Sequence, residues 1–453
     1  MEQIKFEMRK PLRKGDELID YIYELGYDDL PSEVIEQTKR ALLDDLSSAC
    51  AGRRSLEKIG KLMDDLFSDG SDVTVFGSSK KTDIQSAAFL MGSYITYHDY
   101  TDGFNCSGIY SSSFHPGRVL VPAGLLMAEK CKASGKELLT ALVAGYDVAE
   151  RIRNPKYIGL SVADAMAGAA VAAKIAGADK EQLRNAMNIA AFFCPCHNLG
   201  MGENAGNIYD VNYIGNGELV RAAVTGAEMG LKGLTGPKFN DDPNYTRRYS
   251  VHGLGTDFAV MRLYFKPYPT CRKTHAAIEL ALRYRNEFGI MPEEISQIII
   301  YQQHAGMYVN NPVTEKFSYL KKQFSLQYET ACAFVEGDIP FEQLQDNDEV
   351  DPAIFELAQK VTVVPDDALD GCCETTPNHA AMDLVLKDGS VRSLYEPYPC
   401  GSEPNPMSIE QAIAKLKKCT DGWLSEEERN TLLDTIMNVD SIGEMGCLLL
   451  RSK

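Results

Sequence analysis

Apolar residues in roughly the first 265 positions recur mainly at helical spacing. Val34, Leu42 and Leu46 fall on one face of a helix. Pro31 suits the first turn of that helix, and Gly52 suits its end. The same periodicity predicts further helices over residues 84–97, 121–133, 135–152, 163–176, 180–193 and 217–229.

The pattern changes beyond residue 265. A β-branched run at 295–301 and a shorter one at 361–364 predict strands, with a helix at 326–335 between them. Residues 382–386 alternate in polarity and lead into Asp388-Gly389, a strong hairpin signal. Helical spacing returns after Ser408. The chain is therefore predicted to be mainly α with an inserted α+β domain. Its all-helical domain would comprise residues 1–266 and 402–453, and its α/β domain residues 267–401.

Composition narrows the class of partner. The 453 residues are 44% hydrophobic and 24% charged, as in a globular protein, and the length favours two domains. A formal net charge of -18 would repel nucleic acid and anionic lipid surfaces, so neither is an expected partner. With no secretory signal and no membrane-spanning apolar run in the sequence, we expect a cytoplasmic protein whose twelve cysteines are reduced.

The segment 97–118 is the first candidate for chemistry. Asp99 and Asp102 end a predicted helix, and His115-Pro116-Gly117 leads into the next one. Histidine exchanges protons near neutral pH, and loops on a rigid scaffold often carry function. The alternative is that the two aspartates cap helices and that the histidine lies on the surface.

The segment 265–275 is the second candidate. Two prolines prevent a regular helix before Thr270, and Lys266, Arg272, Lys273 and His275 then crowd one short turn. In so acidic a chain, these cations predict an anion pocket at a helix N-terminus. The alternative is a domain hinge with solvated cations.

Cys194-Pro195-Cys196-His197 invites a metal-binding interpretation, with a metalloenzyme as the corresponding function. The spacing is poor for a closed zinc site, and Cys372, Cys373 and His379 supply no convincing second ligand pair. We therefore predict buried thiols and no metal. The sequence also has no phosphate-binding loop, dinucleotide fingerprint or serine elbow.

At these residues the chain resembles the MmgE/PrpD superfamily, which includes 2-methylcitrate dehydratases, cis-aconitate decarboxylases and iminodisuccinate epimerases. The resemblance extends over nearly the whole chain and rests on segments 30–52, Asp99, His115-Pro116-Gly117, Gly145-Tyr146-Asp147 with Arg151, Ile214-Gly215-Asn216, 266–275 and 324–328. It implies an all-helical domain with a smaller α/β lid, and a homodimer. It also implies an active site between the domains, without metal or organic cofactor.

Three positions depart from the decarboxylase-type pattern. Ile158 and Cys271 stand where those members carry histidines, and Asp210 stands where they carry a lysine. Loss of these cations disfavours a substrate with three carboxylates, so the resemblance favours an epimerase-like pocket for a small di- or polycarboxylate. A dehydratase is the alternative enzyme, and a non-catalytic binding protein on the same fold is the alternative of another class.

The resemblance also suggests roles for individual residues. Lys266 and Tyr146 would be an acid/base pair that removes or returns a proton next to a carboxylate. His115 and Asp99 would orient or protonate the substrate. The residues expected to hold the substrate's carboxylates are Arg272, His275, Cys271 and Tyr328.

Overall fold

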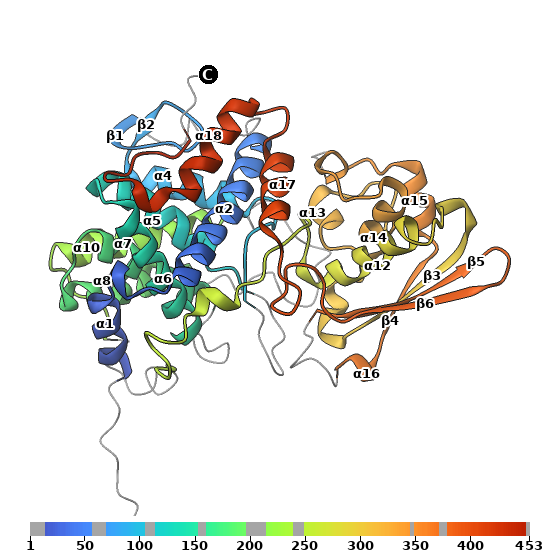
Figure 1. The fold of residues 1–453 in the computed structure, drawn as a ribbon, viewed down its shortest axis with the longest axis horizontal. Coiled ribbons are helices and arrows are strands. Elements are labelled where there is room, and N and C mark those ends of the chain that lie inside the picture. The colour runs from blue at the N-terminus through green and yellow to red at the C-terminus, as the bar shows by residue number, and fades with distance from the viewer. Residues whose placement is uncertain are drawn as a thin grey trace, which may run out of the picture.

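The computed structural model describes residues 14–56, 69–104, 114–152, 160–195, 214–238, 249–344, 348–370 and 378–449. Within these ranges the chain is mainly helical and contains two small sheets (Figure 1). This confirms the predicted class of a mainly α protein with a smaller α/β part.

The helical part is built around a central Ala-rich helix, α7, which packs against α5, α6, α8 and α10. The small side chains of α7 let its neighbours approach closely. The helices of this part are α1 (Lys14–Glu24), α2 (Ser32–Ser55), α4 (Ile84–Thr96), α5 (Gly117–Cys131), α6 (Gly135–Ile152), α7 (Leu160–Ile175), α8 (Lys180–Phe193), α10 (Gly217–Leu231), α17 (Ile409–Thr420) and α18 (Glu426–Met437). All the helices predicted from periodicity are present.

Two details differ from the prediction. Helix α2 does not stop at Gly52 but continues to Ser55. Gly52 instead allows α4 to come close, because a Cβ atom there would lie 1.8 Å from the carbonyl oxygen of Tyr94. The small antiparallel sheet of β1 (Asp69–Thr74) and β2 (Lys81–Thr82) was not predicted, since its residues form no β-branched run.

The α/β part contains one four-stranded sheet in the order β4-β3-β5-β6. Its strands are β3 (Ile295–Gln302), β4 (Val361–Pro365), β5 (Ala380–Leu386) and β6 (Val391–Glu396), and β4 alone runs parallel to its neighbour. The accompanying helices are α12 (His275–Asn286), α13 (Tyr319–Lys322), α14 (Leu326–Glu336), α15 (Pro352–Ala358) and α16 (Asp367–Asp370). The predicted strands and the Asp388-Gly389 hairpin are confirmed. Helices α12, α14 and α15 lie over one face of the sheet (Figure 1).

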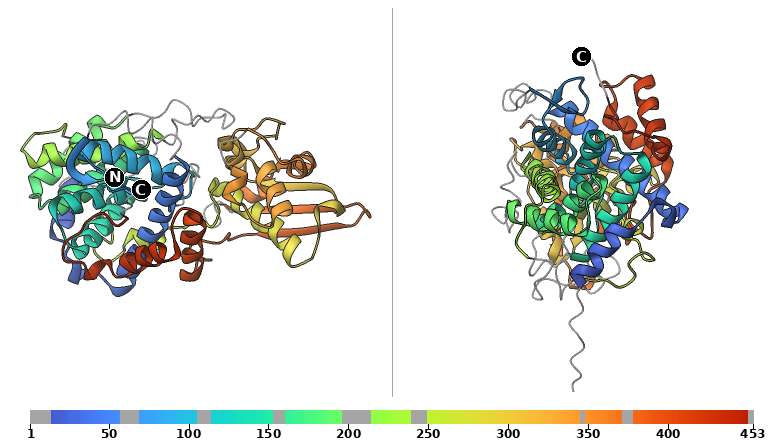
Figure 2. Two further views of the ribbon diagram at one scale, coloured as in Figure 1. Left: turned by 90° about the horizontal axis from the view of Figure 1, so that it is seen from above. Right: turned by 90° about the vertical axis from the view of Figure 1, so that its left-hand side faces the viewer.

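The helical and α/β parts form two lobes that lie side by side in Figure 1 and in the left view of Figure 2. Helix α17 returns to the helical lobe, where it packs against α2. The outgoing and returning segments meet between the lobes, since the Phe265 amide donates to the Gly401 carbonyl at 3.0 Å. The boundaries at 266/267 and 401/402, and the role of the α/β domain as a lid, remain predictions.

Candidate functional site

Lys266 and Asp99 form a buried ion pair between the two lobes. Lys266 Nζ lies 3.0 Å from Asp99 Oδ1 and donates to the Asp99 carbonyl oxygen at 2.6 Å. The lysine side chain is fully buried, whereas that of Asp99 is 14% exposed. Asp99 follows α4 with a φ of 47°, a left-handed conformation that aspartate tolerates better than most residues. The segment 97–118 and the start of the segment 265–275 are thus brought together, as the sequence suggested.

His115 lies beside this pair. Its Nε2 is 4.0 Å from Asp99 Oδ1, and its Nδ1 is 2.6 Å from the backbone carbonyl oxygen of Asp102. A carbonyl oxygen only accepts, so Nδ1 carries a hydrogen, and Nε2 of the neutral ring is left as a proton acceptor. Burial, together with the nearby Lys266 and Arg118 cations, holds the pKa of His115 well below its usual value. The neutral, proton-accepting ring is therefore the form present at neutral pH.

Tyr146 binds the carboxyl group of Asp102, the residue whose backbone holds His115. Its hydroxyl donates to Asp102 Oδ2 at 2.6 Å, and its side chain is fully buried in α6. Burial and the Asp102 carboxyl group raise the pKa of Tyr146 well above its usual value, so the phenol stays protonated. The acid/base role that the resemblance suggests for Tyr146 remains a prediction.

The cations of the segment 265–275 are buried, so they are not solvated as the alternative interpretation required. The Arg272 guanidinium donates to the backbone carbonyls of Cys400 at 2.8 Å and Pro399 at 3.0 Å. It also lies 3.1 Å from His275 Nδ1, and burial holds the pKa of His275 well below its usual value. Arg272 thus joins η4 (Arg272–Thr274) to the returning chain segment.

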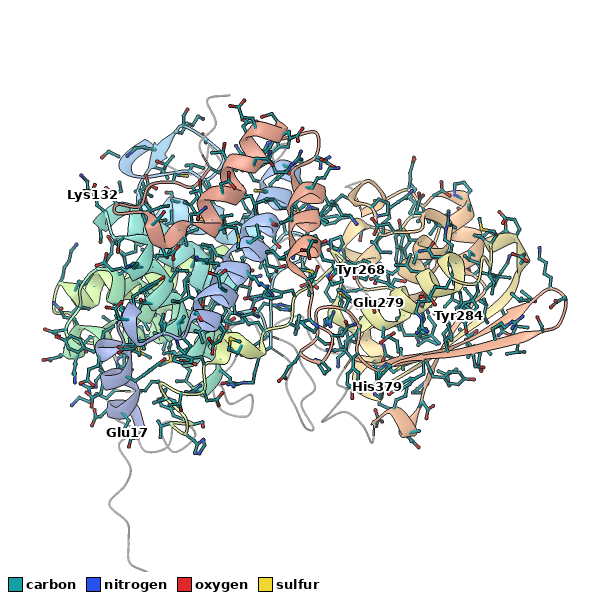
Figure 3. All side chains as sticks on the ribbon, in the orientation of Figure 1. Glu17, Lys132, Tyr268, Glu279, Tyr284 and His379 are labelled. Atoms are coloured by element: carbon teal, nitrogen blue, oxygen red, sulfur yellow. The ribbon has the colours of Figure 1, made fainter. Side chains whose placement is uncertain are left out.

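Glu279 of α12 strengthens the same junction. Its Oε1 accepts a hydrogen bond from the Cys400 amide at 2.8 Å. Burial raises its pKa to about 7, although the Arg272 cation opposes this rise. Tyr268 and Glu279 lie on the side of the α/β lobe that faces the helical lobe (Figure 3).

Cys271 lies close enough to the Lys266–Asp99 pair to be affected by its charges, whereas Tyr328 lies in the core of the α/β lobe. Cys271 Sγ lies 3.2 Å from the Tyr308 hydroxyl. Burial raises the pKa of Cys271 to about 11, with Asp99 adding to the rise and Lys266 opposing it, so the thiol is neutral. Tyr328 belongs to the core of the α/β lobe, where its hydroxyl donates to the Gln343 carbonyl at 2.8 Å.

Several predicted positions lie outside the described residues, namely Ile158, Asp210, Cys196, His197, Cys372 and Cys373. Cys194 is described and is buried at the end of α8. Within the described ranges, the residues whose ligand atoms converge as a metal site requires are His304, Asp367 and Asp370. They lie at the surface, and His304 Nδ1 is 2.6 Å from Asp370 Oδ2.

Two cations near the site were not singled out from the sequence. Arg118, in the first turn of α5, lies 3.2 Å from Asp164 Oδ2 and is 17% exposed. The sequence could have pointed to Arg118 through its position directly after His115-Pro116-Gly117. Lys415 of α17 donates to Asp44 Oδ1 and to the Tyr100 carbonyl, both at 2.6 Å. No local signal marks Lys415, because 315 residues separate it from Tyr100.

Together, these residues offer a neutral imidazole, a buried ammonium–carboxylate pair and a partly exposed guanidinium. A histidine base beside a fixed positive charge can remove a proton from a carbon acid and stabilise the resulting anion. A guanidinium can hold a carboxylate through two hydrogen bonds.

Comparison with known proteins identifies one family over most of the chain. Residues 16–243 match the MmgE/PrpD N-terminal domain, and residues 268–440 match the MmgE/PrpD C-terminal domain. The second match extends through α17 and α18, so it does not mark a boundary near residue 401.

Similar curated proteins come from filamentous fungi. The cis-aconitate decarboxylase-like protein oryM of Aspergillus oryzae is 22% identical, and the alignment covers 96% of each chain. A cis-aconitate decarboxylase of Aspergillus terreus is also 22% identical, over 96% of this chain and 94% of its own. No helix in the described part of the chain has both the length and the apolar character needed to cross a membrane.

Proposed function

Since the chain belongs to the MmgE/PrpD family, we propose that it is a lyase-type enzyme that moves a proton at a carbon next to a carboxylate. The substrate class is a small di- or polycarboxylate. The observation that carries this proposal is the pairing of a proton-accepting His115 with the buried Lys266–Asp99 ion pair. The fungal relatives named as cis-aconitate decarboxylases support lyase chemistry.

In this proposal, each group has a different task. His115 Nε2 exchanges the proton with the substrate carbon, since Nδ1 is held by the Asp102 carbonyl. Lys266 stabilises the negative charge that develops on the substrate carboxylate, and Asp99 holds the ammonium group in place. Arg118 binds a substrate carboxylate, because it is partly exposed and acts electrostatically on both Asp99 and His115.

The fate of the carbanion decides the outcome of the reaction. Loss of a β-hydroxyl group gives dehydration, whereas a carbanion formed by loss of carbon dioxide gives decarboxylation once it takes up a proton. Epimerisation needs a second proton donor on the opposite face. The Tyr146 hydroxyl, predicted for that task, is engaged by Asp102. We therefore place lyase chemistry first.

Epimerisation of a dicarboxylate is the second candidate. The neutral thiol of Cys271 favours it, because this position offers no cation for a third carboxylate. The other two altered positions, Ile158 and Asp210, lie outside the described residues.

A proton NMR screen of small polycarboxylates in deuterated water tests the proposal. It reports α-hydrogen exchange, elimination and decarboxylation together, so it also separates the two candidates. We expect at least one substrate to change in the presence of the wild-type protein. If no di- or tricarboxylate exchanged or reacted, the non-catalytic alternative would hold.

A further inference from the structure

Three buried carboxyl groups lie in or next to the loop that carries Asp99. Asp44 and Asp45 belong to α2, Asp102 belongs to the loop itself, and all three are at most 1% exposed. Lys415 pairs with Asp44, since its Nζ lies 2.6 Å from Asp44 Oδ1. Among the described residues, no lysine or arginine forms an ion pair with Asp45 or Asp102. Two adjacent buried carboxylates that no cation contacts directly are strongly unfavourable.

Asp45 and Asp102 converge over the start of α5. The Asp102 amide points to Asp45 Oδ1 at 3.4 Å, and the Gly117 amide donates to Asp102 Oδ1 at 3.3 Å. A Cβ atom on Gly117 would lie 2.0 Å from Asp45 Oδ2 and 2.6 Å from Asp102 Oδ1. Only glycine leaves room for both carboxyl groups here.

We propose that Asp45 and Asp102 form an acid pair in which Asp45 keeps its proton when Asp102 is ionised, and that this pair positions His115 for proton transfer. The second half of this proposal rests on the proposed function. The first half concerns the protein alone and is tested without a substrate.

The contacts indicate which member of the pair holds the proton. Asp102 accepts hydrogen bonds from the Tyr146 hydroxyl and the Gly117 amide, which suit a carboxylate at a helix N-terminus. Asp45 Oδ2 has no hydrogen-bond partner in the described part of the chain, so its carboxyl group gains little from being charged. Burial and the neighbouring Asp102 and Asp44 raise the pKa of Asp45 well above its usual value, although Lys415 and the Asp102 amide oppose this rise. The direction agrees with a protonated Asp45.

Neighbouring groups both raise and lower the pKa of Asp102. Asp44 of α2 raises its pKa, whereas Lys415 of α17 and the Tyr146 hydroxyl of α6 lower it. Burial is the largest effect and brings the pKa of Asp102 to about 7. His115 is held by the Asp102 backbone and stays neutral in this range. The member of the pair that titrates near neutral pH is thus Asp102.

Asp102 couples the ionisation of its own carboxyl group to the position of His115. Its carboxylate is anchored to α5 and Tyr146, while its backbone carbonyl holds His115 Nδ1. Protonation of Asp102 would weaken the anchor and loosen His115. Asp45, Asp102 and Tyr146 are therefore positioning residues, and ionised Asp102 gives the pH–rate profile an acidic limb near pH 7.

Infrared difference spectroscopy of the full-length protein without substrate tests whether Asp45 holds a proton. We expect the wild type at neutral pH to show a carboxylic-acid carbonyl band that is lost in the Asp45→Asn variant. Subtraction of the two spectra removes the contributions of other buried acids. Retention of the full band in a folded Asp45→Asn variant would overturn the pair, whatever the enzyme's reaction.

The pH dependence of kcat tests the positioning role. Asp45→Asn replaces a neutral group with a neutral one, so the acidic limb should stay within about half a pH unit of the wild type's, because each unit reflects 1.36 kcal/mol of interaction. Tyr146→Phe removes a hydrogen bond that favours ionised Asp102, so its limb should move to higher pH. A downward shift of a unit or more in Asp45→Asn would show that Asp45 is charged, and an unmoved limb in Tyr146→Phe would remove Asp102 from the scheme. Circular dichroism of each variant checks that it is folded.

Discussion

Lys266 Nζ lies 3.0 Å from Asp99 Oδ1, and the lysine reaches this position from the chain segment between the two lobes. One end of the pair is fully buried and the other is partly exposed. The pair therefore lies at the boundary of the lobes, with its lysine screened from bulk water. In the proposed function, this pair is part of the active site.

Replacement of Lys266 by Met should reduce kcat by about 10²–10⁴-fold, the usual effect of losing a group that acts on the transition state. The variant removes the charge that stabilises the substrate anion. Lys322→Met is the matched control, because Lys322 is also buried but donates to the Glu349 carbonyl in the α/β lobe. Steady-state kinetics should show the loss only in Lys266→Met. Equal losses in both variants would indicate a general effect of removing a buried lysine.

Replacement of Arg118 by Met should raise KM by about tenfold or more, since a lost charged hydrogen bond to substrate costs about 1.5–3 kcal/mol. Arg118→Lys keeps the charge but loses the planar fork, so it should recover only part of the affinity. The measurement is KM and kcat for the substrate found by NMR. An unchanged KM in Arg118→Met would show that Arg118 serves only to pair with Asp164.

Glu279 should make the protein less stable as the pH rises. Its pKa is raised to about 7, so the folded state binds a proton that the unfolded state releases near pH 4.5. The stabilisation is complete below the unfolded pKa and is lost as the pH rises through the folded one. Between pH 4.5 and 8 we expect Glu279 to account for a decrease on the order of 3 kcal/mol. Urea denaturation of wild type and Glu279→Gln should show a flatter pH dependence in the variant; parallel curves would contradict this.

Activity should survive dialysis against EDTA, because the predicted chemistry uses side chains alone. The exposed trio His304, Asp367 and Asp370 offers a control. If the trio binds an adventitious ion, His304→Ala should change the metal content without changing kcat. Loss of activity on dialysis and its recovery with one added metal would refute the prediction of a metal-independent enzyme.

The sequence predicted the elements more completely than the site. The bounds of long segments such as α6 and α8 agree with the prediction to the residue, because apolar residues recur there at helical spacing. Asp99, His115 and Lys266 were found because unusual polar residues cluster locally around them. The contacts that fix the role of each side chain were harder to predict than its position in the sequence. Arg272 donates to the Pro399 and Cys400 carbonyls, and Tyr146 donates to Asp102. Local sequence does not reveal these contacts, because the partners are 44 to 128 residues apart in the chain. Lys415 could not be found at all, since nothing around it in sequence differs from an ordinary amphipathic helix.

The most direct test of the central claim is the rate of α-hydrogen exchange between substrate and deuterated water, followed by proton NMR. His115→Asn retains a side-chain NH that can donate to the Asp102 carbonyl but has no ring nitrogen to accept the proton. His304→Asn, at the surface, is the matched control. We predict that exchange falls by at least about 100-fold in His115→Asn and is unchanged in His304→Asn. Wild-type exchange by a folded His115→Asn variant would contradict the role of His115 as the proton-transferring base.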